Sequence, residues 1–260
     1  MSTLLIESLS LATIPDQVFA TPDLEYLSLY NNQLTDIPDA LYSLTSLHTL
    51  NLSANQLTHI SPLIGQLDKL KMIDLGHNRI MALPDQIGLL PHLTDYLYIH
   101  NNQLTALHDS LGRLTTLRYF NASGNPLENV TDAIGQMVAL VELRLNDCQL
   151  VTFPETLGNL VNLRELHLEN NSLTGLTETL SDLANLRVLN LRRNRLAELP
   201  GCILNMRSLN YLDLRDNDLQ TLPDGLLNLP LHKLDLRWNR RLVLPSWIGE
   251  LEARGCTVWV

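Results

Sequence analysis

One pattern of residues returns about every 23 residues along the chain and constrains its fold more than any other feature. A clear copy is Leu24-x-x-Leu27-x-Leu29-x-x-Asn32-x-Leu34, in which x is any residue. Successive asparagine positions are 23 residues apart, except for one step of 24 and one of 22. These positions hold Asn32, Asn55, Asn78, Asn102, Asn125, Cys148, Asn171, Asn194, Asn217 and Asn239. Such a chain is expected to stack equivalent units, because no unit can bury its own leucines alone.

The leucines predict a parallel sheet. The chain holds 62 Leu but only 3 Phe and 3 Trp, so one side chain fills equivalent core sites many times. Leu-x-Leu has the period of a strand with one buried face, and its repetition in one direction predicts parallel strands about 4.8 Å apart. An opening repeat with Leu9 at the asparagine position brings the number of units to eleven, and seven of them continue with an apolar residue and Pro, as in Ile37-Pro38. Because Pro suits a first helical turn, we expect short helices or 3-10 turns on the convex side.

The asparagine positions predict a structural ladder. An amide at the turn after each strand can pair with backbone groups that would otherwise be buried without partners. Cys148 fits this position as a small buried side chain with a weak donor, in preference to a reactive thiol. The single 24-residue step falls between Leu93 and Leu97. Its extra residue must bulge or shift the start of the strand, because an insertion within the strand would reverse its faces.

The pattern resembles the consensus of the leucine-rich-repeat family over essentially all 260 residues. The apolar-Pro continuation is similar to the intracellular Ras-group-related class and to small bacterial repeat proteins. The resemblance implies an α/β fold, a right-handed solenoid or horseshoe with a concave parallel sheet of about 11 strands, and protein binding. We expect one domain over residues 1–260, with an atypical first repeat at 1–23 and a C-terminal cap at 245–260.

Side chains between and after the paired leucines are expected to face the concave side, where neighbouring units touch. Six of the seven tyrosines map to this face, and only Tyr42 does not. Tyrosine gives rigid contact area, so we predict a protein-binding surface; the alternative is that strands favour aromatic residues anyway. The predicted binding residues are Tyr26, Tyr30, Tyr96, Tyr98, His100, Tyr119, Arg144, His167, Arg192, Tyr211, Arg215, Arg237 and Trp238.

Charge is divided unevenly along the chain. Residues 1–186 hold 7 Lys+Arg against 20 Asp+Glu, a balance of -13, whereas residues 187–260 hold 11 against 8, a balance of +3. The predicted column of Arg192, Arg215 and Arg237 could accept an acidic segment of a partner. Alternatively, the neighbouring Asp213 and Asp235 neutralise it. The acidic remainder argues against nucleic-acid and membrane partners.

Catalytic and cofactor motifs are missing from the sequence. It has no P-loop, GxGxxG, HExxH or nucleophile elbow, so we expect no catalytic residues, no cofactor and no metal site. His77, His100 and Asp74 could approach one another, but they lack metal-ligand spacing. The alternative function is a substrate-recognition module or regulatory subunit of a multi-domain enzyme or bacterial effector whose catalytic part lies elsewhere.

The expected compartment is the cytoplasm. Residues 1–14 lack a basic region and cleavage site, and the three cysteines form no CxxC pair. Delivery to a host cell by a route independent of a signal peptide is the alternative. We expect a monomer, with self-association possible through an exposed apolar first strand at residues 3–7.

Overall fold

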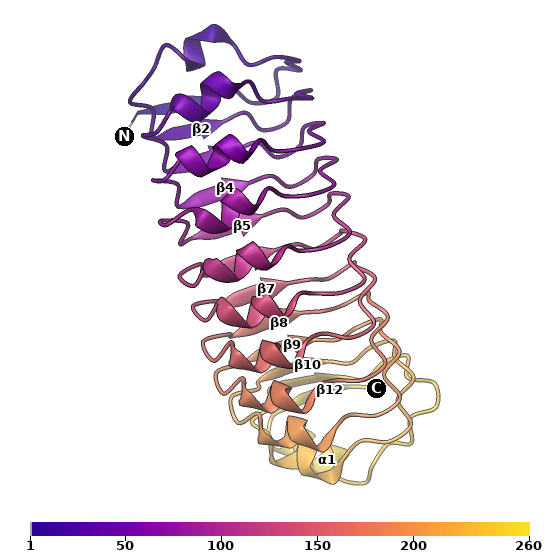
Figure 1. The fold of residues 1–260 in the computed structure, drawn as a ribbon. Helices are drawn as coiled ribbons and strands as arrows, with labels where there is room; N and C mark the ends of the chain where they lie inside the picture. The colour runs from indigo at the N-terminus through magenta and orange to yellow at the C-terminus, as the bar shows by residue number, and fades with distance from the viewer. Residues whose placement is uncertain (1) are drawn as a thin grey trace.

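The computed structural model describes residues 2–260 and contains one open parallel sheet of twelve strands, paired in chain order (Figure 1). The strands are β1 Thr3–Leu5, β2 Tyr26–Ser28, β3 Thr49–Asn51, β4 Met72–Asp74, β5 Tyr96–Tyr98, β6 Tyr119–Asn121, β7 Glu142–Arg144, β8 Glu165–His167, β9 Val188–Asn190, β10 Tyr211–Asp213, β11 Lys233–Asp235 and β12 Thr257–Trp259. The predicted repeat solenoid is therefore confirmed.

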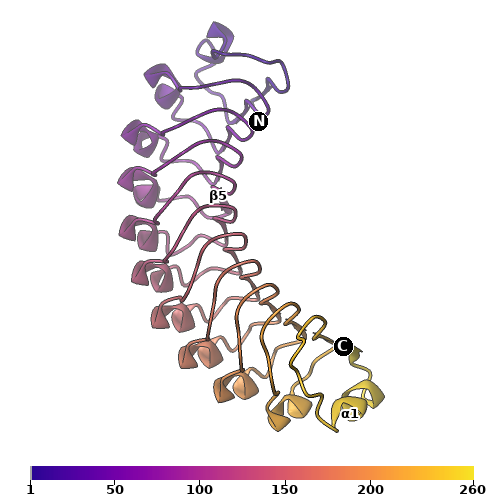
Figure 2. The ribbon, with the colours of Figure 1, turned by 90° about the vertical axis from the view of Figure 1, so that its right-hand side faces the viewer.

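Short 3-10 helices return the chain between the strands and lie along the outer curve, opposite the sheet (Figure 2). They are η1 Asp16–Val18, η2 Asp39–Ser43, η3 Pro62–Gln66, η4 Asp85–Leu89, η5 Asp109–Arg113, η6 Asp132–Gln136, η7 Glu155–Asn159, η8 Glu178–Asp182, η9 Gly201–Asn205 and η10 Asp224–Asn228. In six of them Pro directly precedes the first helical residue, at the N-cap. Pro therefore lies one residue before the first helical turn in which the sequence pattern predicts it, and the extended φ and ψ angles of the N-cap suit Pro.

The core is a single hydrophobic cluster, made mostly of leucines, that runs through the units from Ile6 to Cys256. Leu27 and Leu29 are both fully buried, and Leu27 lies beside Leu4 and Leu50 in the sheet register. Each unit therefore adds its leucines to the same rows, which stacking alone makes inaccessible to water.

The asparagine after each strand joins neighbouring units. Asn55 Nδ2 donates to the backbone oxygens of Leu29 and Leu52 at 3.0 Å, and its Oδ1 accepts from Leu34 N at 3.1 Å. Cys148 donates weakly to Ala122 O at 3.7 Å but gives no acceptor, so Leu127 N turns to Asn125 O. Burial raises the pKa of the Cys148 thiol to about 11, which matches a structural side chain.

The extra residue of the fifth unit is absorbed before its strand. Met72 still pairs with Tyr96 and Ile73 with Leu97, so the buried face is unchanged. In regular units two successive N–H groups share one carbonyl, as Lys71 and Met72 share His48 O. After the insertion, Arg118 N and Tyr119 N bind two different oxygens, those of Thr94 and Asp95. The predicted shift at the start of the strand is confirmed.

Both ends depart from the regular unit. Leu5 in β1 is 61% exposed, as expected for an edge strand, although β1 ends at Leu5 and not at residue 7. At the other end α1 (Ile248–Ala253) precedes β12, whose Val258 pairs with Leu234. This closing strand makes the count twelve where the eleven units alone predict about eleven.

Candidate binding surface

The parallel register brings the predicted face residues into rows on the concave side. Tyr96 lies beside Tyr119, Arg144 beside His167, and Tyr211 beside Lys233. Tyr26 and Tyr30 belong to the second unit and lie apart from the other aromatic residues. The predicted residues thus form three groups on consecutive strands of the face, with Tyr26 and Tyr30 outside them.

The first group is an aromatic cluster on β5 and β6, formed by Tyr96, Tyr98 and Tyr119. The rings of Tyr96 and Tyr119 stack with centroids 4.8 Å apart, and the ring of Tyr98 is 5.3 Å from that of Tyr96. Burial raises the pKa of the Tyr98 hydroxyl to about 12. These half-buried rings lie on the side of the sheet opposite the leucine core, so they present a firm aromatic surface.

His100 extends this cluster toward β4. Its ring meets Tyr98 edge-on at 6.1 Å and His77 at 4.8 Å. A Cβ atom on Gly76 would lie 2.3 Å from His100 Cε1, so the glycine makes room for the ring. Burial lowers the pKa of His100, and its Nδ1 is buried without a hydrogen-bond partner. His100 is therefore neutral in character and belongs with the tyrosines.

The second group surrounds Arg144 and His167 on β7 and β8. Arg144 Nε pairs with Glu142, and His167 Nε2 lies 3.3 Å from Glu165 Oε2. Among residues 2–260, Glu142, Glu165 and His167 are the one set of side chains close enough to hold a metal ion, within 4.8 Å of one another. Because a guanidinium already neutralises Glu142, this set is explained as a charge network.

The third group is a charge lattice at the C-terminal end. Asp213 and Asp235 are completely buried, and Arg215 Nε lies 2.9 Å from Asp213 Oδ1 and 3.2 Å from Asp235 Oδ2. Arg237 Nη2 lies 2.7 Å from Asp235 Oδ2. Hydrogen bonds to these aspartates raise the pKa of both arginines. Of the two interpretations of the arginine column, neutralisation describes Arg215 and Arg237.

Arg192 differs from the two lattice arginines. Its own strand carries Asn190 where theirs carry Asp, and its Nε is buried without a partner. Its guanidinium lies 6.0 Å from the ring of Trp238, which is 57% exposed. Lys233 is held nearby between Tyr211 and Trp259, at 4.8 and 4.0 Å from their ring centroids. This end of the face therefore offers cations backed by aromatic rings.

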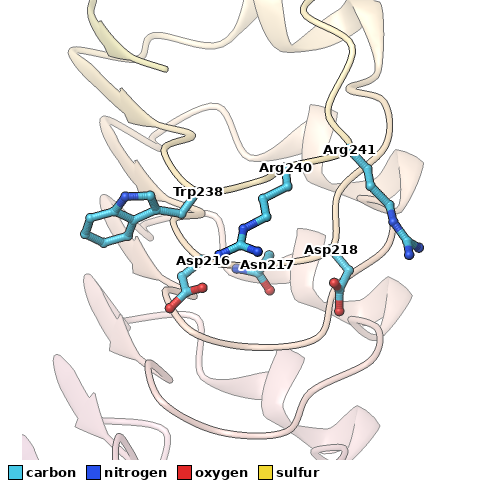
Figure 3. A pocket seen from close by; sticks show the side chains of 6 residues that line it. All are labelled: Asp216, Asn217, Asp218, Trp238, Arg240 and Arg241. Atoms are coloured by element: carbon cyan, nitrogen blue, oxygen red, sulfur yellow. The ribbon is translucent and has the colours of Figure 1, made fainter.

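Beside Trp238 the structure has a polar cavity of about 310 Å³ that the sequence interpretation missed (Figure 3). It is lined by Asp216, Asn217, Asp218, Trp238, Arg240 and Arg241. Figure 3 shows Arg240 reaching toward the asparagine between the two aspartates, with Arg241 on the outer side. Two features of the sequence could have indicated this cavity. They are the 22-residue step before Asn239 and the pair Arg240-Arg241 that follows it.

The fold and this face define the chain as an open solenoid with a polar, aromatic concave sheet. Profiles described as leucine rich repeat match residues 1–57, 45–95, 68–127 and 139–196, and another of the same description matches 208–229. The chain belongs to the leucine-rich-repeat family. Folds of this family are typical of protein–protein interaction modules and of ligand-binding receptors.

Three solved structures illustrate the similarity. The Leptospira interrogans LRR protein LIC12759 is 29% identical with a TM-score of 0.91, over 96% of this chain and 64% of that one. The ectodomain of the Arabidopsis thaliana receptor kinase GASSHO1/SCHENGEN3, in complex with CASPARIAN STRIP INTEGRITY FACTOR 2, is 31% identical with a TM-score of 0.76, over 86% and 28%. PEPR1–AtPEP1 is 28% identical with a TM-score of 0.80, over 99% and 41%.

The chain is shorter than each of these three proteins and spans less than two thirds of their lengths. No curated protein matches the sequence. Within residues 2–260, no helix has the length and apolar character needed to cross a membrane.

Proposed function

We propose that this chain is a non-catalytic recognition scaffold that binds a protein partner on its concave face. The observation that carries the proposal is the stacked cluster of Tyr96, Tyr98 and Tyr119 on that face. The rings do not fill the leucine core, yet they are held in fixed mutual contact. Preformed aromatic surface is what binding hot spots use, because little side-chain entropy is lost when a partner covers it.

The polar residues on the rest of the concave face would form the rim of a binding site centred on this cluster. Arg144 and His167 on one side are paired with glutamates, and the C-terminal lattice is internally neutralised. Arg192 is half-buried beside Trp238 and makes no ion pair among residues 2–260, so it is the residue of the arginine column best placed to meet an acidic side chain of the partner. Among the compared proteins, PEPR1 and GASSHO1/SCHENGEN3 are complexed with AtPEP1 and CASPARIAN STRIP INTEGRITY FACTOR 2.

A second candidate is a recognition module within a longer protein. It is favoured by the lengths of the compared chains, of which this one spans 64%, 28% and 41%. The two candidates share the same binding face, and the full open reading frame distinguishes them.

We place the protein in a reducing compartment, the cytoplasm or the interior of a host cell. Cys148, Cys202 and Cys256 are unpaired and buried, and burial raises the pKa of Cys202 to about 11. Unpaired thiols kept neutral in this way fit a compartment in which disulfides do not form.

The test compares capture of a partner by the wild type and by Tyr96→Ala/Tyr98→Ala/Tyr119→Ala. A matched control, Met81→Ala/Leu89→Ala/Val151→Ala, removes three exposed apolar side chains outside the concave face. Calorimetry with the captured partner should show each tyrosine truncation weakening binding by more than about 1 kcal/mol, with unfolding nearly unchanged. If the triple tyrosine variant and the control bound the partner with equal affinity, the tyrosine cluster would not be the binding site.

A further inference from the structure

A second surface lies along the flank of the solenoid where the strands begin. We call it the arginine flank and define it by the segments 115–118, 138–141, 161–164, 184–187 and 207–210. Their sequences are Thr-Thr-Leu-Arg, Val-Ala-Leu-Val, Val-Asn-Leu-Arg, Ala-Asn-Leu-Arg and Arg-Ser-Leu-Asn. They contain four arginines and no Asp or Glu, although the chain has 28 Asp+Glu against 18 Lys+Arg. The flank is thus a basic strip on an acidic protein.

The arginines of the flank are exposed and unpaired. Arg118, Arg164, Arg187 and Arg207 make no ion pair within the part of the chain that the structure describes. The two glutamates that follow in the sequence are engaged on the concave side, Glu142 with Arg144 and Glu165 with His167. The charges of the flank are therefore not neutralised by ion pairs, unlike those of Arg215 and Arg237, and the Arg118 guanidinium lies 5.6 Å from the ring centroid of Tyr119.

The flank also contains apolar surface between its charges. A cavity of about 360 Å³ is lined by Thr116, Arg118, Ala139, Val141, Asn162 and Arg164. Arg118 and Arg164 lie on its two sides, with the small apolar side chains of Ala139 and Val141 between them. Beside this cavity Val138 and Val161 are 43% and 47% exposed. Two cations around an apolar floor suit an acidic ligand that also carries an apolar group.

Hydrogen bonds between units fix the spacing of the flank. Arg187 N donates to Arg164 O at 2.8 Å, Arg164 N to Val141 O at 2.8 Å, and Val141 N to Arg118 O at 2.8 Å. Outside this row, Asn162 Nδ2 donates to Val138 O at 2.9 Å. In the same way, Asn185 Nδ2 donates to Val161 O at 2.8 Å. Neighbouring strands are about 4.8 Å apart. Along the row, Arg164 therefore lies about 5 Å, Val141 about 10 Å and Arg118 about 14 Å from Arg187.

These spacings match one face of an α-helix. With a rise of about 1.5 Å per residue, helix positions i, i+3, i+7 and i+10 lie at roughly 0, 4.5, 10.5 and 15 Å and point in nearly the same direction. We propose that the arginine flank is a docking site for an acidic amphipathic helix of a protein partner. Carboxylates at i, i+3 and i+10 meet Arg187, Arg164 and Arg118, and an apolar side chain at i+7 covers Val141. This surface goes beyond the proposed concave-face function and does not depend on it.

The probe is a synthetic helical peptide with Glu at i, i+3 and i+10 and Leu at i+7. A control peptide of identical composition carries its glutamates on the opposite face. The variant Arg164→Glu/Arg187→Glu tests the flank. Its matched control, Arg79→Glu/Arg113→Glu, makes the same change of charge at two exposed arginines elsewhere. Thermal unfolding verifies that both variants fold.

Fluorescence anisotropy should show that the flank variant binds the designed peptide at least about tenfold more weakly than the wild type. The charge control should stay within about twofold of the wild type, and added salt should weaken wild-type binding. The proposal is overturned if the designed peptide fails to bind, if the control peptide binds equally well, or if both variants lose affinity alike. Flank-dependent binding of anionic phospholipid vesicles, duplex DNA or a second copy of the chain, without binding of the peptide, would overturn it too.

Discussion

The buried lattice on β10 and β11 predicts a large difference between two neighbouring arginines. Arg215 bridges Asp213 and Asp235, both completely buried, whereas Arg192 one strand away has no ionic partner among the described residues. The same substitution at the two positions, Arg215→Gln and Arg192→Gln, removes a guanidinium from the same column of the sheet. Only the first leaves a buried carboxylate without its counter-charge.

The magnitude follows from what Asp213 and Asp235 retain. Removal of one partner from a buried ion pair costs about 3–5 kcal/mol. The expected loss for Arg215→Gln is smaller, about 2–3 kcal/mol, because Asp213 still accepts a hydrogen bond from the backbone N of residue 215 and Asp235 keeps Arg237. Arg192→Gln should change the free energy of unfolding by less than about 0.5 kcal/mol.

Urea unfolding at neutral pH, followed by circular dichroism, measures both variants. The double variant Asp213→Asn/Arg215→Gln should recover a large part of the loss, because it removes the stranded charge together with its partner. Equal midpoints for Arg215→Gln and Arg192→Gln would refute the reasoning, and the Arg215 contacts would then contribute no more than an exposed pair.

Two further predictions concern the core and the asparagine positions. Leu166→Ala should reduce the free energy of unfolding by roughly 2–5 kcal/mol, since Leu166 is fully buried, and an unchanged denaturation midpoint would show that the side chain is not packed as described. Because burial raises the pKa of Cys148 to about 11, its thiol should stay protonated at pH 8 and react with iodoacetamide far more slowly in the native protein than in urea; equal rates would contradict its burial.

The sequence predicted the fold because every unit repeats the same physical requirements. Leucine spacing determines the buried rows, and the asparagine after each strand determines where the backbone needs a partner. Even the extra residue between Leu93 and Leu97 was predictable, since only a change before the strand preserves the faces. The count of about eleven strands corresponds to the eleven units, and the closing strand β12, within the predicted C-terminal cap, makes twelve.

The binding surface was less predictable, because it depends on how side chains choose among several neighbours. The pattern placed Tyr96, Tyr98 and Tyr119 on one face, but only the structure shows the stacking of the rings. Likewise, the sequence offered Asp213 and Asp235 as candidates to neutralise the arginine column. Only the sheet register shows that Arg215 also pairs with Asp235 of the next strand. One clue was present in the sequence: Arg215 and Arg237 follow Asp by two residues, whereas Arg192 follows Asn190.

The excess of arginine in residues 187–260 is therefore not one basic patch. Arg215 and Arg237 are internal to the lattice, and Arg193 pairs with Asp216. Arg187 and Arg207 belong to the flank, and Arg240 and Arg241 line the cavity beside Trp238. The net charge of +3 over this part of the chain thus overstates the positive charge that a concave-face partner would meet. Within the lattice, the arginines are already paired with buried aspartates. Arginines without an ion pair lie on the flank, at the cavity and, as Arg192, on the concave face, and these are the surfaces where electrostatic attraction of a partner should act.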